Sequence, residues 1–118
     1  MIVLPIYIFE RDDLSFRKFD EFSDVYFCEK IDVLESLYEG WDSTGRHLAV
    51  VWDELADCPA LREGEENLSG FIDSINAYSD ACKVAGISFS EKHGKKKNEL
   101  CDPSELRRCV ESIEHLTT

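Results

Sequence analysis

A short turn between two strand-like segments is the feature of this sequence that most constrains its fold. Residues 38–42 (YEGWD) and 47–52 (HLAVVW) have the composition of paired β-strands. In the loop between them, Gly45 supplies the positive φ that a short connection with a bulge requires. Asp42 can accept hydrogen bonds from the amides of that turn. Because residues 48–52 are nearly all apolar, we expect their strand to lie inside an antiparallel sheet.

The N-terminal residues are expected to supply another buried strand. Residues 2–9 (IVLPIYIF) are apolar, but they are too short to cross a bilayer. They also follow no basic leader, and no small-residue cleavage site comes after them. We therefore expect a cytoplasmic protein without a membrane partner. Residues 10–15 are expected to form a charged turn, and residues 16–19 are too few to assign.

The first of three expected helices covers residues 24–36, with Ser23 as its N-cap. On a helical wheel, one arc is apolar and most of the other arc is acidic. The apolar arc consists of Tyr26, Phe27, Ile31, Val33, Leu34 and Leu37. Lys30 is the one charge on that arc, and its long side chain can reach water. We expect this helix to bury its apolar arc and to expose an almost wholly acidic face.

The other two helices have clearer ends. An apolar stripe predicts a helix over about 69–85, and Gly86 follows as its C′ residue. Asp102, Pro103 and Glu105 have the spacing of a capping box that starts the last helix.

The segments combine into one domain. Between the last two helices, residues 87–89 are expected to form a short strand and residues 91–99 a solvated linker. The sequence contains no internal repeat and no sign of a second domain. Residues 1–118 are therefore predicted to be a single α+β domain, with a small, mainly antiparallel sheet and about three helices packed on it.

Negative charge is concentrated between residues 20 and 66. This stretch holds 14 acidic and three basic residues, an excess of eleven negative charges, whereas residues 91–118 hold six of each sign. Such a field favours a basic protein partner and speeds docking onto it. Within the stretch, residues 53–67 are rich in acids and contain Pro59 and Gly64, so we expect a long acidic loop there.

No pattern of residues predicts catalysis, a metal site or a cofactor. The glycines are too scattered for a phosphate-binding loop, and the histidines have no ligand neighbour at helical spacing. Five cysteines give neither a disulfide framework nor a zinc pair, so we interpret them as small buried hydrophobes in a reducing compartment. A nucleophilic pair of Cys58 with His47 is an alternative, but acids surround Cys58 instead of activating bases.

Binding of nucleic acid is not expected either. The one basic run, residues 95–97, has no aromatic stacking platform beside it and would have to overcome a net charge of −12. Two interpretations of the acidity stay open: a solubilising surface or a partner-binding surface. Tyr38 and Trp41 lie among the acids, and aromatic anchors of this kind are typical of interfaces.

This arrangement resembles the small, acidic, single-domain bacterial immunity proteins of contact-dependent inhibition and other polymorphic toxin systems. The resemblance covers about residues 1–55. It consists of the apolar first strand, the acidic helix with the run 32–35 (DVLE), and the hairpin 38–48 (YEGWDSTGRHL).

The resemblance implies a cytoplasmic antitoxin that neutralises a basic toxin domain, which we expect to be a nuclease. Its carboxylates would replace substrate phosphates and pair with lysines or arginines of the toxin. Under this hypothesis the predicted contact residues are Asp32, Glu35, Glu39, Trp41, Asp53, Glu54, Glu65 and Glu66. The alternative is an acidic protein-binding or DNA-mimic regulatory module without a toxin partner. Neither hypothesis requires a cofactor.

Overall fold

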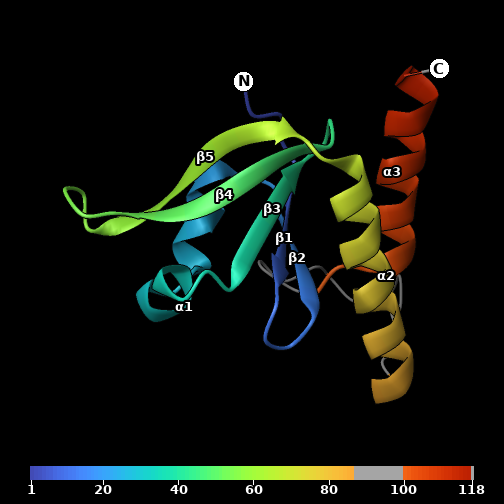
Figure 1. The fold of residues 1–118 in the computed structure, drawn as a ribbon, viewed down its shortest axis with the longest axis horizontal. Coiled ribbons are helices and arrows are strands. Elements are labelled where there is room, and N and C mark those ends of the chain that lie inside the picture. Colours follow the sequence, from blue (N-terminus) through green and yellow to red (C-terminus); the bar gives the residue numbers. More distant parts are fainter. Residues whose placement is uncertain (87–99, 118) are drawn as a thin grey trace.

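A five-stranded antiparallel sheet with strand order β2-β1-β3-β4-β5 organises the protein (Figure 1). The strands are β1 (Ile6–Glu10), β2 (Ser15–Phe19), β3 (Tyr38–Asp42), β4 (Arg46–Asp53) and β5 (Cys58–Glu66). The computed structural model describes residues 1–86 and 100–117, and the predicted strand 87–89 and linker 91–99 lie outside these residues. The predicted α+β class is confirmed.

The predicted hairpin is present as β3 and β4, and β4 lies inside the sheet. Asp42 Oδ1 accepts hydrogen bonds from the backbone amides of Thr44 and Arg46 at 2.9 and 3.1 Å. Gly45 has the expected positive φ of 86°. The second oxygen of Asp42 accepts from the Val3 amide at 3.1 Å, so this buried carboxylate also attaches the N-terminal segment to the sheet.

The first strand is shorter than predicted, because it begins at Ile6 and not at residue 2. Residues 16–19, which the sequence left unassigned, belong to β2 and pair with β1. Alternate side chains of β1 enter the two halves of the core: Tyr7 and Phe9 on one face of the sheet, Ile6 and Ile8 on the other. The apolar run therefore reflects burial on both faces.

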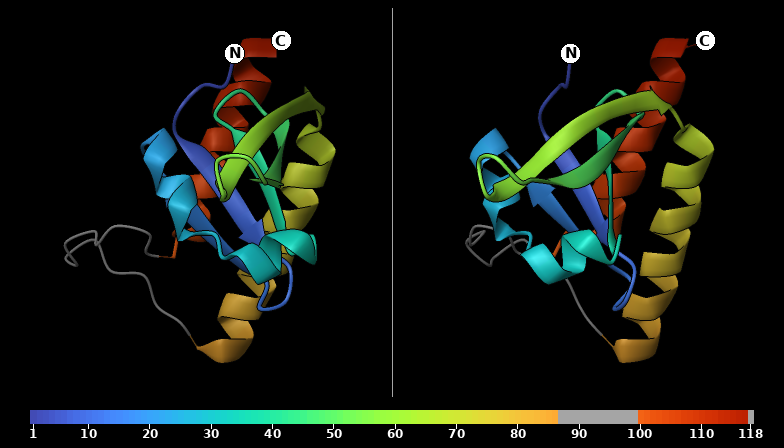
Figure 2. Two further views of the ribbon diagram at one scale, coloured as in Figure 1. Left: turned by 90° about the vertical axis from the view of Figure 1, so that its left-hand side faces the viewer. Right: turned by 60° about the vertical axis from the view of Figure 1, so that its left-hand side comes forward.

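Two long helices cover one face of the sheet. The helices α2 (Leu68–Ala85) and α3 (Pro103–Thr117) lie side by side in both figures (Figure 1, Figure 2). The predicted bounds of α2 and the predicted start of α3 are confirmed within one residue: Gly86 ends α2 in the left-handed region, and α3 begins at Pro103. The core beneath them is strongly aromatic and includes Tyr7, Phe9, Phe16, Trp41, Phe71 and Tyr78.

The predicted helix over 24–36 is wrong. The segment instead forms a 3₁₀ helix, η1 (Phe22–Phe27), and a single short α-helix, α1 (Lys30–Leu34), separated by extended backbone. Asp24 fixes the start of η1, because its Oδ2 accepts from the amides of Asp20 and Glu21. Because the segment is not one continuous α-helix, the α-helical wheel does not apply, and Val25 in η1 and Cys28 in the extended backbone after it are buried although the wheel placed them on the acidic side.

The predicted long acidic loop over 53–67 is also wrong. Residues 58–66 form β5, an edge strand that pairs only with β4 among the strands that the structure describes. An edge strand tolerates proline and charged side chains, because one of its sides faces solvent. Pro59 lies opposite Trp52 in the register. The acids that suggested a loop therefore mark the exposed edge of the sheet.

Candidate protein-binding surface

Trp41, one of the predicted contact residues, does not reach the surface. It is 0% exposed, and its ring stacks on Phe71 at a centroid distance of 5.2 Å. Its indole Nε1 donates to the Asn67 carbonyl oxygen at 3.0 Å. Trp41 therefore belongs to the aromatic core and is corrected from contact residue to core residue. The two tryptophans do not meet, since Trp52 packs against the core on the opposite face of the sheet.

Glu39 lies on the face of the sheet that α2 and α3 cover, because it pairs in register with Phe9. Its two carboxylate oxygens are close to two bases: Oε2 is 3.0 Å from Arg11 Nη2, and Oε1 is 2.9 Å from His47 Nε2. The sheet separates Glu39 from α1, which carries Asp32. The predicted contact residues therefore do not form one continuous face.

The acids of the β4–β5 hairpin are divided between its two ends. Asp53 and Glu54 lie at the turn, whereas Glu65 and Glu66 lie beside the start of α2 (Figure 1). The nine residues of β5 separate the two pairs by about 25 Å at the usual rise of a strand.

One group of predicted residues does lie on neighbouring elements. α1 contacts both β4 and β5, and the hairpin turn, α1 and η1 lie away from α2 and α3 (Figure 1, Figure 2). Lys30 joins α1 to the hairpin: its Nζ is 5.5 Å from the centroid of the Trp52 ring and 4.0 Å from Asp57 Oδ1. We call this region the α1–hairpin surface. It is defined by Asp32, Glu35, Asp53 and Glu54.

The four carboxylates of this surface differ in their surroundings. Asp32 is partly buried and accepts from the Tyr38 hydroxyl at 3.3 Å. Asp53 Oδ1 accepts from the amides of Leu55 and Ala56, so it stabilises the hairpin turn. Glu35 and Glu54 are exposed. These last two side chains can change without loss of a contact described for the fold.

Sequence analysis missed a set of exposed apolar side chains on η1 and α1. Tyr26 is 64% exposed, Ile31 63% and Leu34 60%, although the wheel predicted all three to be buried. We call these side chains the η1–α1 patch. It consists of Phe22, Tyr26, Phe27, Ile31 and Leu34. The spacing of Glu21 and Asp24, which form the capping box of η1, was the available signal that the segment starts two residues earlier than the wheel assumed.

An open hollow of about 810 Å³ adjoins this patch at Phe22. Its apolar lining comes from Ile2, Phe22, Trp52 and Leu61, and its charged lining includes Asp53 and Arg62. The N-terminal ammonium of Met1 lies 2.6 Å from Glu63 Oε1 and holds the first residues beside β5. The hollow is therefore lined by apolar side chains and by charged groups of both signs.

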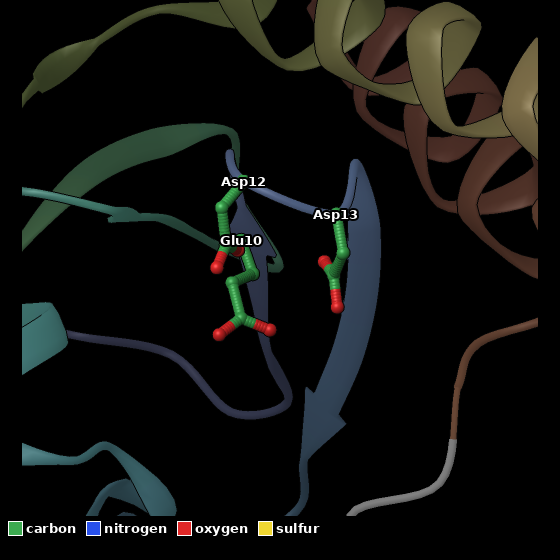
Figure 3. Close-up of side chains that lie close together, drawn as sticks. All are labelled: Glu10, Asp12 and Asp13. Atoms are coloured by element: carbon green, nitrogen blue, oxygen red, sulfur yellow. The ribbon is translucent and has the colours of Figure 1, made fainter.

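A second acidic cluster lies at the β1–β2 turn (Figure 3). One carboxylate oxygen each from Glu10, Asp12 and Asp13 lies within 4.8 Å of the others. Burial, together with the negative charges of Asp13 and Asp12, raises the pKa of Glu10 to about 7. Asp13 also accepts from the Ser15 hydroxyl at 2.5 Å. This cluster is a site of charge repulsion, and exposed acids in such a group do not by themselves define a cation site.

The geometry does not support the cysteine alternative. His47 lies opposite Trp41 and Cys58 lies opposite Asp53, so about six residues of β4, or about 20 Å, separate them. Cys28, Cys82 and Cys101 are buried, as predicted for the cysteines, whereas Cys58 and Cys109 are only partly buried. Burial raises the pKa of the Cys28 thiol to about 12, with a contribution from the charges of Glu10 and Asp32.

Comparisons of the chain with protein-family models, with curated proteins and with solved structures found no match. Within residues 1–86 and 100–117, neither of the long helices is apolar enough over a sufficient length to span a bilayer. The function is therefore inferred from the chemistry of the protein's surfaces.

Proposed function

We propose that the protein is an immunity protein that binds and neutralises a basic toxin domain, a nuclease, through the α1–hairpin surface. The observation that carries this proposal is that α1, with Asp32 in it and Glu35 at its end, contacts the β4–β5 hairpin, which carries Asp53 and Glu54 at its turn. A surface with this excess of carboxylates complements a cleft that binds phosphates.

The inhibitory mechanism would be occupation of the toxin's substrate cleft. Carboxylates of the α1–hairpin surface would take the places of substrate phosphates and accept hydrogen bonds from lysine and arginine side chains. Close charge pairs of this kind can contribute about 1.5–7 kcal/mol of coupling across an interface, and the acidic field raises the association rate. A fast and tight inhibitor suits a toxin that acts within the cell.

The test begins with capture of the partner by the tagged chain from a lysate of its host, at low and at high salt. The captured protein is then purified, and its nuclease activity on plasmid DNA and on tRNA is titrated with the chain. We expect complete inhibition at a 1:1 ratio and weaker capture at high salt. A partner without nuclease activity, or a nuclease that stays active, would contradict the antitoxin assignment and favour a regulatory acidic module.

Two charge-reversed variants with equal net charge locate the inhibitory surface. Glu35→Lys with Glu54→Lys changes the α1–hairpin surface and should abolish inhibition. Glu65→Lys with Glu66→Lys changes the other end of β5 and should leave inhibition close to that of the unmodified chain. Equal losses in both variants would mean that overall charge, and not this surface, determines binding.

A further inference from the structure

We infer that the η1–α1 patch, together with the adjoining hollow, is the apolar centre of a docking site whose occupant is a cationic protein surface. This inference rests on the proposed function only in the charge that it assigns to the partner. It adds that the apolar side chains, and not the carboxylates, determine how long the complex lasts.

The patch concentrates exposed apolar side chains in one short segment of the chain. Each of its five side chains is at least 38% exposed, and all five come from 13 consecutive residues. Contiguous apolar surface rimmed by polar groups is typical of protein interaction sites. The hollow extends this surface, because Phe22 belongs to the patch and also lines the hollow beside Trp52. A bulky apolar side chain of a partner fits this space.

The backbone that carries the patch packs on the sheet through buried side chains. Val25, Cys28 and Val33 are buried against the sheet, so the opposite sides of η1 and α1 point outward. The guanidinium carbon of Arg17 lies over the Phe27 ring, 4.7 Å from its centroid. Anchors that are ordered before binding cost little conformational entropy on association.

The charges around the patch decide between possible occupants. Three exposed acids, Glu21, Glu29 and Glu35, lie in or beside the segments that carry it, and they outnumber the exposed base Lys30. In a two-fold dimer the same patch would meet itself, and these acids would face one another. A cationic surface with apolar side chains at its centre would pair with the acids around the patch and pack against its apolar side chains. It is therefore the occupant that we assign.

A photo-crosslinking amino acid identifies the occupant directly. Benzoylphenylalanine replaces Tyr26 in the patch and, as a control, Val84, an equally apolar exposed position on α2. In host lysate, position 26 should crosslink to a protein with an excess of lysine and arginine, and position 84 should not. A crosslinked dimer of twice 13.5 kDa, a crosslink to residues 87–99 of the same chain, or no crosslink would overturn the inference.

Kinetics with the purified crosslinked protein separate the apolar centre from the charged rim. Tyr26→Ser with Ile31→Ser should raise the dissociation rate by at least about 30-fold, as expected for anchor side chains. Glu35→Lys should mainly lower the association rate and its salt dependence. Val84→Ser should change neither rate, and circular dichroism confirms that each variant is folded.

The two proposals can fail separately. If the crosslinked partner is basic but has no nuclease activity, the docking site stands and the antitoxin function fails. If a nuclease is inhibited equally well by the Tyr26→Ser, Ile31→Ser variant, the function stands and the docking site fails.

Discussion

The two faces of the sheet are covered by helices of different length, and this difference separates the core from the surface. On one face, α2 and α3 extend over 18 and 15 residues and enclose an aromatic core. On the other face, η1 and α1 have six and five residues. Such short segments bury only the side chains that point directly at the sheet. Their other apolar groups stay in solvent, among acids.

Apolar residues of similar type therefore have different roles on the two faces of the sheet. Trp41 and Phe71 stabilise the fold by packing against each other, whereas Tyr26 and Ile31 are exposed and contribute little burial. Stability and partner binding should therefore respond to different substitutions. The four predictions below test that separation, beginning with the largest expected effect.

Trp41→Ala should destabilise the protein by about 3–5 kcal/mol, because it leaves a cavity in the aromatic core and removes the bond to Asn67. Tyr26→Ala should change the free energy of unfolding by less than about 0.5 kcal/mol. Urea denaturation of both variants measures the difference. Comparable losses in the two would mean that the η1–α1 patch is part of the core in solution.

Asp42→Ala should destabilise the protein by about 2–3 kcal/mol, because three partly buried amides, two in the turn and that of Val3, lose a charged acceptor. Thr44→Val removes a single hydrogen bond to the same carboxylate and should cost about 1 kcal/mol. The measurement is the shift of the urea midpoint. An unchanged midpoint in Asp42→Ala would show that the turn does not depend on this side chain.

Glu39→Lys and Glu35→Lys make the same change of charge on opposite faces of the sheet. Glu39→Lys places an ammonium beside Arg11 and His47 and should lower stability by about 1 kcal/mol, while partner binding stays intact. Glu35→Lys should weaken partner binding and leave the melting temperature unchanged. Thermal melts measure the stability of both variants, and capture assays measure their partner binding. If Glu39→Lys weakened partner binding and Glu35→Lys did not, the binding surface would lie on the face of α2 and α3.

Glu10→Gln should alter the pH dependence of stability slightly. The pKa of Glu10 in the folded protein, about 7, is above its ordinary value of 4.5, because Asp13, Asp12 and Asp32 add to the effect of burial. Its ionisation therefore costs stability as the pH rises from about 4.5 to about 7. Relative to the unmodified chain, Glu10→Gln should gain stability at pH 8 and gain none at pH 4. A constant difference across that range would contradict the raised pKa.

Sequence reasoning predicted the elements whose signals are local. The hairpin follows from the carboxylate of Asp42 and the positive φ at Gly45, and the ends of α2 and α3 follow from Gly86 and Pro103. In each case the decisive interaction joins residues within a few positions, so it can be recognised without knowledge of the rest of the chain. The α+β class followed from these elements together.

The failures share a different physical cause. Residues 58–66 have the composition of a loop, and they form a strand because β4 offers a partner edge. The wheel for residues 24–36 assumed one uninterrupted α-helix, whereas the segment is broken between η1 and α1, and Val25 and Cys28 pack into the core on that face of the sheet. Both outcomes depend on contacts between segments, which a local pattern does not contain.

For the candidate surface, too, local properties could be predicted from the sequence and the packing of segments could not. Three features follow from the amino-acid sequence alone: the excess of acids between residues 20 and 66, the turn chemistry of the hairpin and the amphipathic nature of the long helices. Only the tertiary structure decided that Trp41 is buried, that Glu39 faces away from Asp32, and that Tyr26 is exposed. The reason is that exposure depends on which element packs over a residue. Packing is set by the free energy of contacts distant in sequence, whereas charge and turn preference belong to the residues themselves.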